Sequence, residues 1–151
     1  MERLRDLLGG DGGDGGGVAL FVDGPNVLRE EFDVDLDDVR ETAEAAGQLA
    51  VTRLYVDEHA TPELIQAAEA RGFDVRVTSG DVDVKLAVDA TELVLSEPVD
   101  VLAVASRDTD FKPVLEKAAR RGVKTLAIAP GEHGRSDALR HAATDAVVLG
   151  E

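Results

Sequence analysis

The sequence contains no cysteine and no tryptophan, and aromatic residues make up only 3% of its 151 positions. Without cysteine, the chain has no disulfide framework, no catalytic thiol and no thiolate ligand for a metal ion. No apolar run is long enough to cross a membrane, and the opening residues MERLR lack the pattern of a signal peptide. We therefore expect a cytoplasmic protein that has no membrane partner.

Positive charge is also scarce. The chain carries 31 acidic and 16 basic residues, for a formal net charge of -15, and it has only four lysines. High ionic strength screens the self-repulsion of such a surface. The composition is therefore typical of a halophilic protein in a salt-rich cytoplasm, and it argues against a broadly basic nucleic-acid-binding surface.

The first 17 residues differ in composition from the rest. A short head, Met1–Leu8, precedes the sequence GGDGGDGGG at Gly9–Gly17. This run lacks the Gly-Lys-Ser/Thr ending of a phosphate-binding loop, so we interpret it as a flexible linker. The remaining residues, 18–151, are enough for one domain with its own core.

Short apolar runs alternate with helical patterns along this domain. The pattern predicts strands at 18–22, 49–56, 73–77, 99–105, 123–128 and 146–149. It predicts helices at 35–46, 61–72, 83–95, 110–121 and 136–143. Because the strands are continuous apolar runs, they are typical of a parallel sheet covered on both faces. The sequence thus predicts an α/β fold with three layers, α/β/α, around a mainly parallel sheet, as in Rossmann-like domains.

Acidic residues gather where three of these strands end. The segments are Asp23-Gly24-Pro25-Asn26, Asp81-Val82-Asp83 and Ser106-Arg107-Asp108-Thr109-Asp110. Right-handed crossovers bring such strand ends to one edge of the sheet, where α/β proteins bind their ligands. Clustered carboxylates without cysteine or histidine favour Mg²⁺ or Mn²⁺. We therefore predict one metal site surrounded by Asp23, Asp83, Asp108 and Asp110.

Each of these acids also has an ordinary structural interpretation. Asp110 could be the N-cap of the helix that follows it, and Asp81 or Asp83 could cap the helix at 83–95. Asp23 and Gly24 could simply form a turn. In so acidic a chain, a single aspartate is most often a solvated surface group. These interpretations leave unexplained why the acids occur together at three strand ends.

Asp89 is a separate case. It follows Asp83 by six residues, which places it about 9 Å farther along the helix and about 120° around it. One ion can hardly bind both carboxylates, so Asp89 holds an outer position or binds no metal. It interrupts an apolar run, and burying it is unfavourable unless it has a partner.

Three motifs together resemble the NYN domain family, a group of PIN-like nucleases, and in particular its archaeal branch. They are FVDGPN at 21–26, GDVDVKLAVDA at 80–90 and SRDTDF at 106–111. The resemblance covers residues 18–150 and implies metal-dependent cleavage of RNA by a PIN-like fold. By position it implies catalytic, metal-binding roles for Asp23, Asp83, Asp108 and Asp110, and supporting roles for Asn26, Ser106 and Asp89. Asp145 is left out, because the late segment AATDAVVL departs from the family pattern.

RNA is the partner that this resemblance implies. Lys85, Arg107 and Lys112 lie near the predicted metal site and are our candidates for phosphate contacts, and Arg29, Arg135 and Arg140 are further cations there. Tyr55 and Phe32 are too few to form a base-stacking platform. The alternative is a non-catalytic PIN-like module that binds RNA or another protein. The sequence leaves open whether the chain forms a homo-oligomer.

Overall fold

The computed structural model describes residues 16–28, 35–131 and 143–149. The strands are β1 (Val18–Asp23), β2 (Leu49–Asp57), β3 (Asp74–Thr78), β4 (Val101–Ala105), β5 (Lys124–Pro130) and β6 (Asp145–Leu149). The helices are α1 (Gly24–Val27), α2 (Leu36–Glu44), α3 (Pro62–Ala70), α4 (Val82–Ser96), the 3-10 turn η1 (Thr109–Phe111) and α5 (Lys112–Arg120). None of the helices in these ranges combines the length and hydrophobicity that a membrane span requires.

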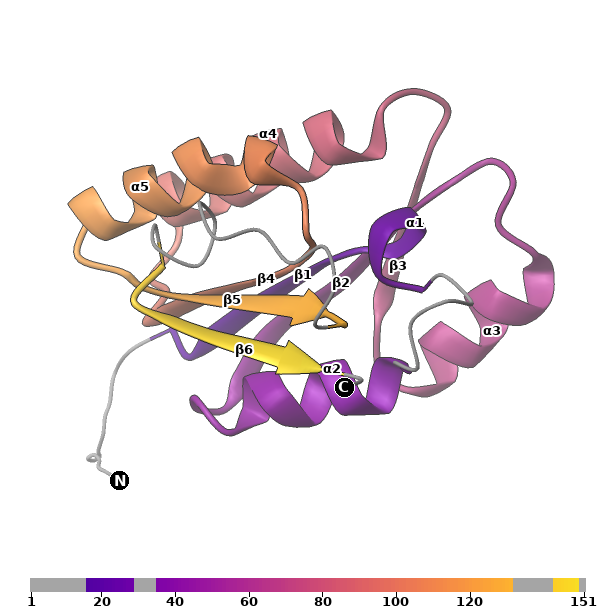
Figure 1. The fold of residues 1–151 in the computed structure, drawn as a ribbon, viewed down its shortest axis with the longest axis horizontal. Helices are drawn as coiled ribbons and strands as arrows, with labels where there is room; N and C mark the ends of the chain where they lie inside the picture. The colour runs from indigo at the N-terminus through magenta and orange to yellow at the C-terminus, as the bar shows by residue number, and fades with distance from the viewer. Residues whose placement is uncertain (1–15, 29–34, 132–142, 150–151) are drawn as a thin grey trace.

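The six described strands form one sheet in the order β3-β2-β1-β4-β5-β6, and every neighbouring pair is parallel. Helices α4 and α5 cover one face of the sheet, and α2 and α3 cover the other (Figure 1). This arrangement confirms the three-layer α/β/α prediction. The order of the strands reverses between β1 and β4, so the carboxyl ends of these two strands flank the topological switch point.

Strand β1 lies in the middle of this arrangement and is buried along its whole length. Leu20 and Val22 pack into the core beneath α2 and α3, whereas Ala19 and Phe21 pack beneath α4 and α5. Successive side chains of a strand point to opposite faces, so a strand covered on both sides must be apolar at every position. This requirement explains the continuous run VALFV in the sequence.

Two helices begin where capping residues predict. Asp35 and Asp38 form a reciprocal capping box at the start of α2, in which the Asp38 N–H donates to Asp35 Oδ1 at 2.9 Å. At the start of α3, the Thr61 hydroxyl accepts the N–H of Leu64 at 3.1 Å, and Pro62 occupies the first turn. Both starts agree with the sequence pattern.

Other boundaries differ from the prediction. The single helical turn α1 directly follows β1 and was not predicted, although Pro25 favours the first turn of a helix. Strand β4 begins at Val101 rather than Val99, because Asp100 binds Gly17: its carboxylate accepts the Gly17 N–H at 3.2 Å, and its own N–H donates to the Gly17 carbonyl at 2.9 Å. Gly17, the last residue of the predicted linker, is therefore tied to the fold. The helix predicted at 136–143 falls almost entirely outside the described residues.

Phe111 anchors the segment between β4 and α5. Its side chain is fully buried among residues of β1, α4 and α5. We expect Phe111→Ala to lower the free energy of unfolding by about 3–5 kcal/mol, because it leaves a large cavity in a packed core. Denaturant unfolding measures this change. Val77→Ala, at a side chain that is 57% exposed, is the control and should cost less than about 1 kcal/mol. Equal losses in the two variants would show that Phe111 has no anchoring role.

Candidate metal centre

The loop that follows β4 is held in place by hydrogen bonds from side chains. The hydroxyl of Ser106, which is fully buried, accepts the Asp108 N–H at 3.0 Å and donates to Asp23 Oδ2 at 3.1 Å. The Asp108 carboxylate in turn accepts the Asp110 N–H at 2.9 Å. Ser106 therefore links the end of β1 to the acidic loop after β4.

Three carboxylates converge beside this loop. Asp83 in the first turn of α4, Asp108 in the loop and Asp110 in η1 each offer an oxygen atom, and these oxygens lie within 4.8 Å of one another. Asp83 and Asp108 are partly buried, and Asp110 is exposed. We refer to these three residues as the acidic cluster. The cluster is formed by segments that are far apart in the sequence, as the strand-end argument predicts.

Asp23 lies next to the acidic cluster but does not belong to this set of three. Its side chain is buried at the end of β1 and only 4% exposed. The pKa of Asp23 is raised to about 6, first by burial and then by the negative charges of Asp108 and Asp83, against the opposing hydrogen bond from Ser106. The pKa of Asp108 is also raised, first by burial and then by the charges of Asp110 and Asp83. The site therefore holds more negative charge than its surroundings stabilise.

A divalent cation fits this arrangement. Carboxylate oxygens are the ligands that Mg²⁺ and Mn²⁺ prefer, and the acidic cluster presents three of them around one point. A cation there would also offset the repulsion that adds to the effect of burial on the pKa values of Asp23 and Asp108. Asp83, Asp108 and Asp110 are thus the residues that could hold the ion. Asp23, buried at the end of β1, would add negative charge next to them.

Capping hydrogen bonds do not account for Asp81, Asp83 or Asp110. The residue at the N-cap position of α5 is Phe111, so the interpretation of Asp110 as its N-cap is wrong. Asp81 occupies the N-cap position of α4, but its side chain makes no capping hydrogen bond. The Asp83 carboxylate accepts the N–H of the adjacent Val84 at 2.9 Å, which is not the hydrogen bond of an N-cap.

Asn26 supports the site from α1. Its side-chain oxygen accepts the backbone N–H of Arg107 at 2.8 Å. This bond ties the turn after β1 to the loop after β4, across the topological switch point. The contact acts through the backbone of the loop, and the supporting role that the resemblance implies for Asn26 stays a prediction.

Asp89 lies outside the acidic cluster and has partners of its own. The Tyr55 hydroxyl donates to its carboxylate at 2.7 Å, and the Lys85 ammonium lies 3.2 Å from its other oxygen. The sequence indicated that Asp89 needs a partner but did not identify Tyr55, which lies 34 residues earlier. Tyr55 is fully buried. Burial is the main reason that its pKa is raised, and the hydrogen bond to Asp89 is the second. A buried Tyr55 offers no stacking surface for bases.

Two of the three cations predicted to contact phosphates have acidic neighbours. Lys85 pairs with Asp89, and Lys112 lies 4.0 Å from Glu116. Lys112 also lines a hollow of about 580 Å³ together with Asp83 and Asp110. Arg107 is partly buried in the loop after Ser106. Arg29, Arg135 and Arg140 fall outside the described residues.

Comparisons with known proteins agree with this fold. The model of the NYN domain matches residues 17–150. An uncharacterized protein from the archaeon Methanocaldococcus jannaschii is 43% identical over 134 residues, which are 89% of this chain and 55% of that protein. The chain thus spans about half the length of this curated relative. A crystal structure of a protein of unknown function from Vibrio parahaemolyticus has a TM-score of 0.74 at 21% identity, and the alignment covers 92% of this chain and 96% of that chain.

Because Asp23 is buried, the free energy of unfolding should depend on pH. Between pH 3.8 and about 6, Asp23 keeps its proton in the folded protein but loses it in the unfolded chain. The contribution of this group to the free energy of unfolding therefore falls as the pH rises through that range. Without metal, we expect Asp23→Asn to be more stable than the wild type at pH 7 by about 2–3 kcal/mol, and by much less at pH 4. Denaturant unfolding in a chelator at both pH values measures the difference.

Asp74→Asn is the control for that experiment. Asp74 is an exposed acid whose pKa is lowered, mainly by its hydrogen bond from Arg76. Its removal should not stabilise the protein at pH 7. A gain for Asp23→Asn that is equal at both pH values would contradict the burial argument.

The separate roles of Asp89 and Asp108 make a further prediction. Asn at position 89 keeps an oxygen for the Tyr55 hydroxyl and lies outside the acidic cluster, so we expect Asp89→Asn to weaken Mn²⁺ binding by less than about threefold. Asp108→Asn removes a candidate ligand and should weaken binding at least about tenfold. Isothermal titration of each folded variant with Mn²⁺ gives the two affinities. Equal losses would mean that Asp89 also belongs to the metal site.

Proposed function

The chain belongs to the NYN domain family, and we propose that it is a metal-dependent ribonuclease that hydrolyses RNA phosphodiester bonds at the acidic cluster. NYN domains are part of the PIN-like nuclease superfamily, which implies a nuclease-like hydrolase. The observation that carries the proposal is the convergence of three carboxylates within 4.8 Å at the edge of the sheet where α/β proteins bind ligands. The ion that we propose for this site is Mg²⁺ or Mn²⁺.

In this proposal Asp83, Asp108 and Asp110 hold the cation. When bound, such a cation polarises the scissile phosphate and lowers the pKa of an attacking water. The Ser106 hydroxyl accepts the backbone N–H of Asp108, which holds Asp108 in place. The same hydroxyl donates to the Asp23 carboxylate and fixes its orientation. Asn26 holds the same loop through the backbone of Arg107. These contacts keep the carboxylates in place before substrate binds.

Phosphate binding would rely on local positive charge. Lys112 lines the hollow beside Asp83 and Asp110, and among the cations in the described ranges it is the best placed to contact an RNA phosphate there. Lys85 lies two residues after Asp83 at the start of α4, and Arg107 directly precedes Asp108. With a net charge of -15, the rest of the surface repels RNA, so binding should be confined to this edge of the sheet.

Cleavage of a generic single-stranded RNA, with Mn²⁺ or Mg²⁺ at high salt, tests this function. We expect the wild type to cleave only when metal is present, and Asp83→Asn and Asp108→Asn to lose at least about 100-fold in kcat/KM. Glu97→Gln is the matched control, because it removes the same charge just beyond the other end of α4, about 20 Å from Asp83. It should keep activity within about twofold.

Two results would overturn the assignment. The first is a wild-type protein that cleaves no RNA under any of these conditions, which would leave the non-catalytic module as the better account if RNA still binds. The second is an Asp108→Asn variant as active as the wild type, which would place the chemistry elsewhere.

A further inference from the structure

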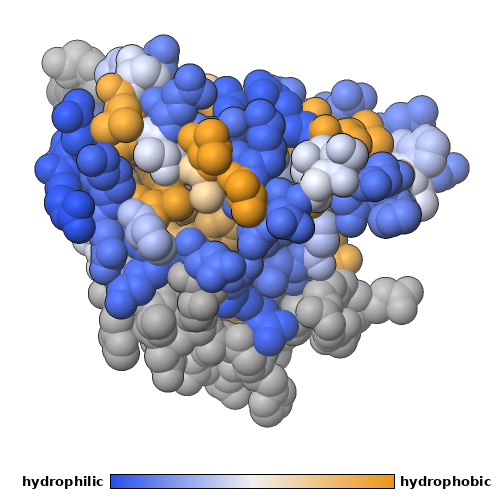
Figure 2. All heavy atoms as spheres, turned by 90° about the horizontal axis from the view of Figure 1, so that it is seen from above, coloured by the Kyte–Doolittle hydropathy of each residue, from blue (hydrophilic) through white to orange (hydrophobic). Residues whose placement is uncertain are grey.

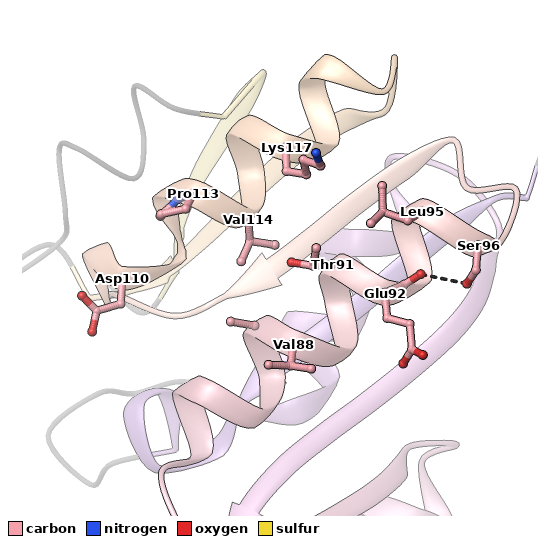
Figure 3. Close-up of a pocket in the computed structure, with 10 residues that line it drawn as sticks. Val88, Thr91, Glu92, Leu95, Ser96, Asp110, Pro113, Val114 and Lys117 are labelled. Carbon is pink, nitrogen blue, oxygen red and sulfur yellow. Dashed lines mark hydrogen bonds between the residues drawn. The ribbon is translucent and has the colours of Figure 1, made fainter.

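An apolar groove runs between α4 and α5 on the outer surface of the protein. It has a volume of about 840 Å³, and Val88, Thr91 and Leu95 of α4 face Val114 of α5 across it (Figure 3). Val88 is 59% exposed and Leu95 is 45% exposed. Figure 2 shows apolar side chains gathered in a hollow on this face, bordered by hydrophilic ones. Exposed apolar patches of this kind mark interaction surfaces or ligand-binding grooves.

The groove leads to the acidic cluster at one end. Asp110 and Val88 line both the groove and the hollow that contains Asp83. At its other end the groove is lined by Leu95 and Ser96, where α4 ends. Whatever occupies the groove therefore borders the acidic cluster.

The chain itself enters the fold beside the far end of the groove. Gly16 packs so closely against the Pro98 carbonyl that a Cβ atom on residue 16 would overlap the carbonyl oxygen. Gly17 forms a hydrogen bond with the Asp100 carboxylate. Pro98 follows Ser96, the last residue of α4, by only two positions. The seven residues 9–15 between this point and the head are Gly and Asp only, and such a linker has a root-mean-square span of about 15 Å. The head Met1–Leu8 is thus tethered within reach of the groove.

The head has the pattern that the groove requires. On a helix, Met1, Leu4, Leu7 and Leu8 share one face, Arg3 and Arg5 flank it, and Glu2 and Asp6 lie on the opposite face. Eight helical residues are about 12 Å long, which equals the distance along α4 from Val88 to Ser96.

The charges of the groove also suit this head. The charged residues that line it are Glu92, Asp110 and Lys117, so its net charge is negative. The two arginines that flank the apolar face of the head are therefore complementary to it. A tether that raises the effective concentration of the head to the millimolar range makes even a weak apolar contact sufficient.

We propose that the N-terminal head, Met1–Leu8, docks in the groove between α4 and α5 of its own chain, with Leu4, Leu7 and Leu8 against Val88 and Leu95. This contact does not depend on the nuclease function, and its test involves no RNA.

Disulfide trapping tests the docking, because the chain has no cysteine of its own. The full-length variant with Leu7→Cys and Leu95→Cys is oxidised at low micromolar concentration, and the rate of intramolecular bond formation is followed by non-reducing electrophoresis and mass spectrometry. We expect this rate to be at least tenfold faster than for Leu7→Cys paired with Val77→Cys, an exposed position on β3.

A second control distinguishes docking of the head from trapping that occurs only because the linker keeps the head close to the groove. Adding Leu4→Glu and Leu8→Glu to the Leu7→Cys, Leu95→Cys variant keeps the linker but removes the apolar face, and should slow trapping at least tenfold. Val88→Cys in place of Leu95→Cys gives an independent position in the groove, and unfolding midpoints confirm that each variant is folded. Trapping that is insensitive to the two glutamates, trapping only between two chains, or no trapping at either groove position would overturn the proposal.

Discussion

Repulsion between carboxylates at one edge of the sheet is the constraint on which the rest of this structure depends. Asp83, Asp108 and Asp110 bring carboxyl oxygens within 4.8 Å of one another, and Asp23 is buried beside them. Burial raises the pKa values of Asp23 and Asp108, and the negative charge of the neighbouring carboxylates raises them further. Hydrogen bonds from Ser106 and from backbone N–H groups hold the acids in place but do not neutralise them. Proteins retain such locally unfavourable arrangements at functional sites, and a bound cation would relieve this one.

The fold makes the crowding possible because its strands are parallel. Strands β1 and β4 are neighbours at the point where the strand order reverses, so Asp23 and the loop after Ala105 meet there. Helix α4 packs against β1 and begins at the same edge, which brings Asp83 to the loop. Asn26 and Ser106 then lock the two strand ends to each other. The sheet therefore determines where the acids lie, and two polar side chains keep the loop that carries them in register.

Much of this could be predicted from the sequence because burial on both faces of the sheet leaves a simple signature. Apolar runs located all six described strands, and the acids at three strand ends indicated the site. What the sequence could not provide were contacts between distant side chains. The bond from Tyr55 to Asp89 spans 34 residues, and it explains a buried acid that the pattern only marked as needing a partner. The burial of Asp23 beneath the acidic cluster, and the exposure of Val88 and Leu95, likewise depend on how α4 packs on the sheet and beside α5.

The central claim is that Asp83, Asp108 and Asp110 bind one divalent cation together. The groove and its proposed occupant border this centre, and the ribonuclease activity that we propose depends on it. An anomalous difference map from crystals of the protein grown with Mn²⁺ tests the claim directly. We predict a peak within about 2.0–2.6 Å of oxygens from all three carboxylates, the range for hard cations bound by oxygen. The account would be contradicted if crystals grown in saturating Mn²⁺ showed no anomalous peak among these residues, or a peak only elsewhere.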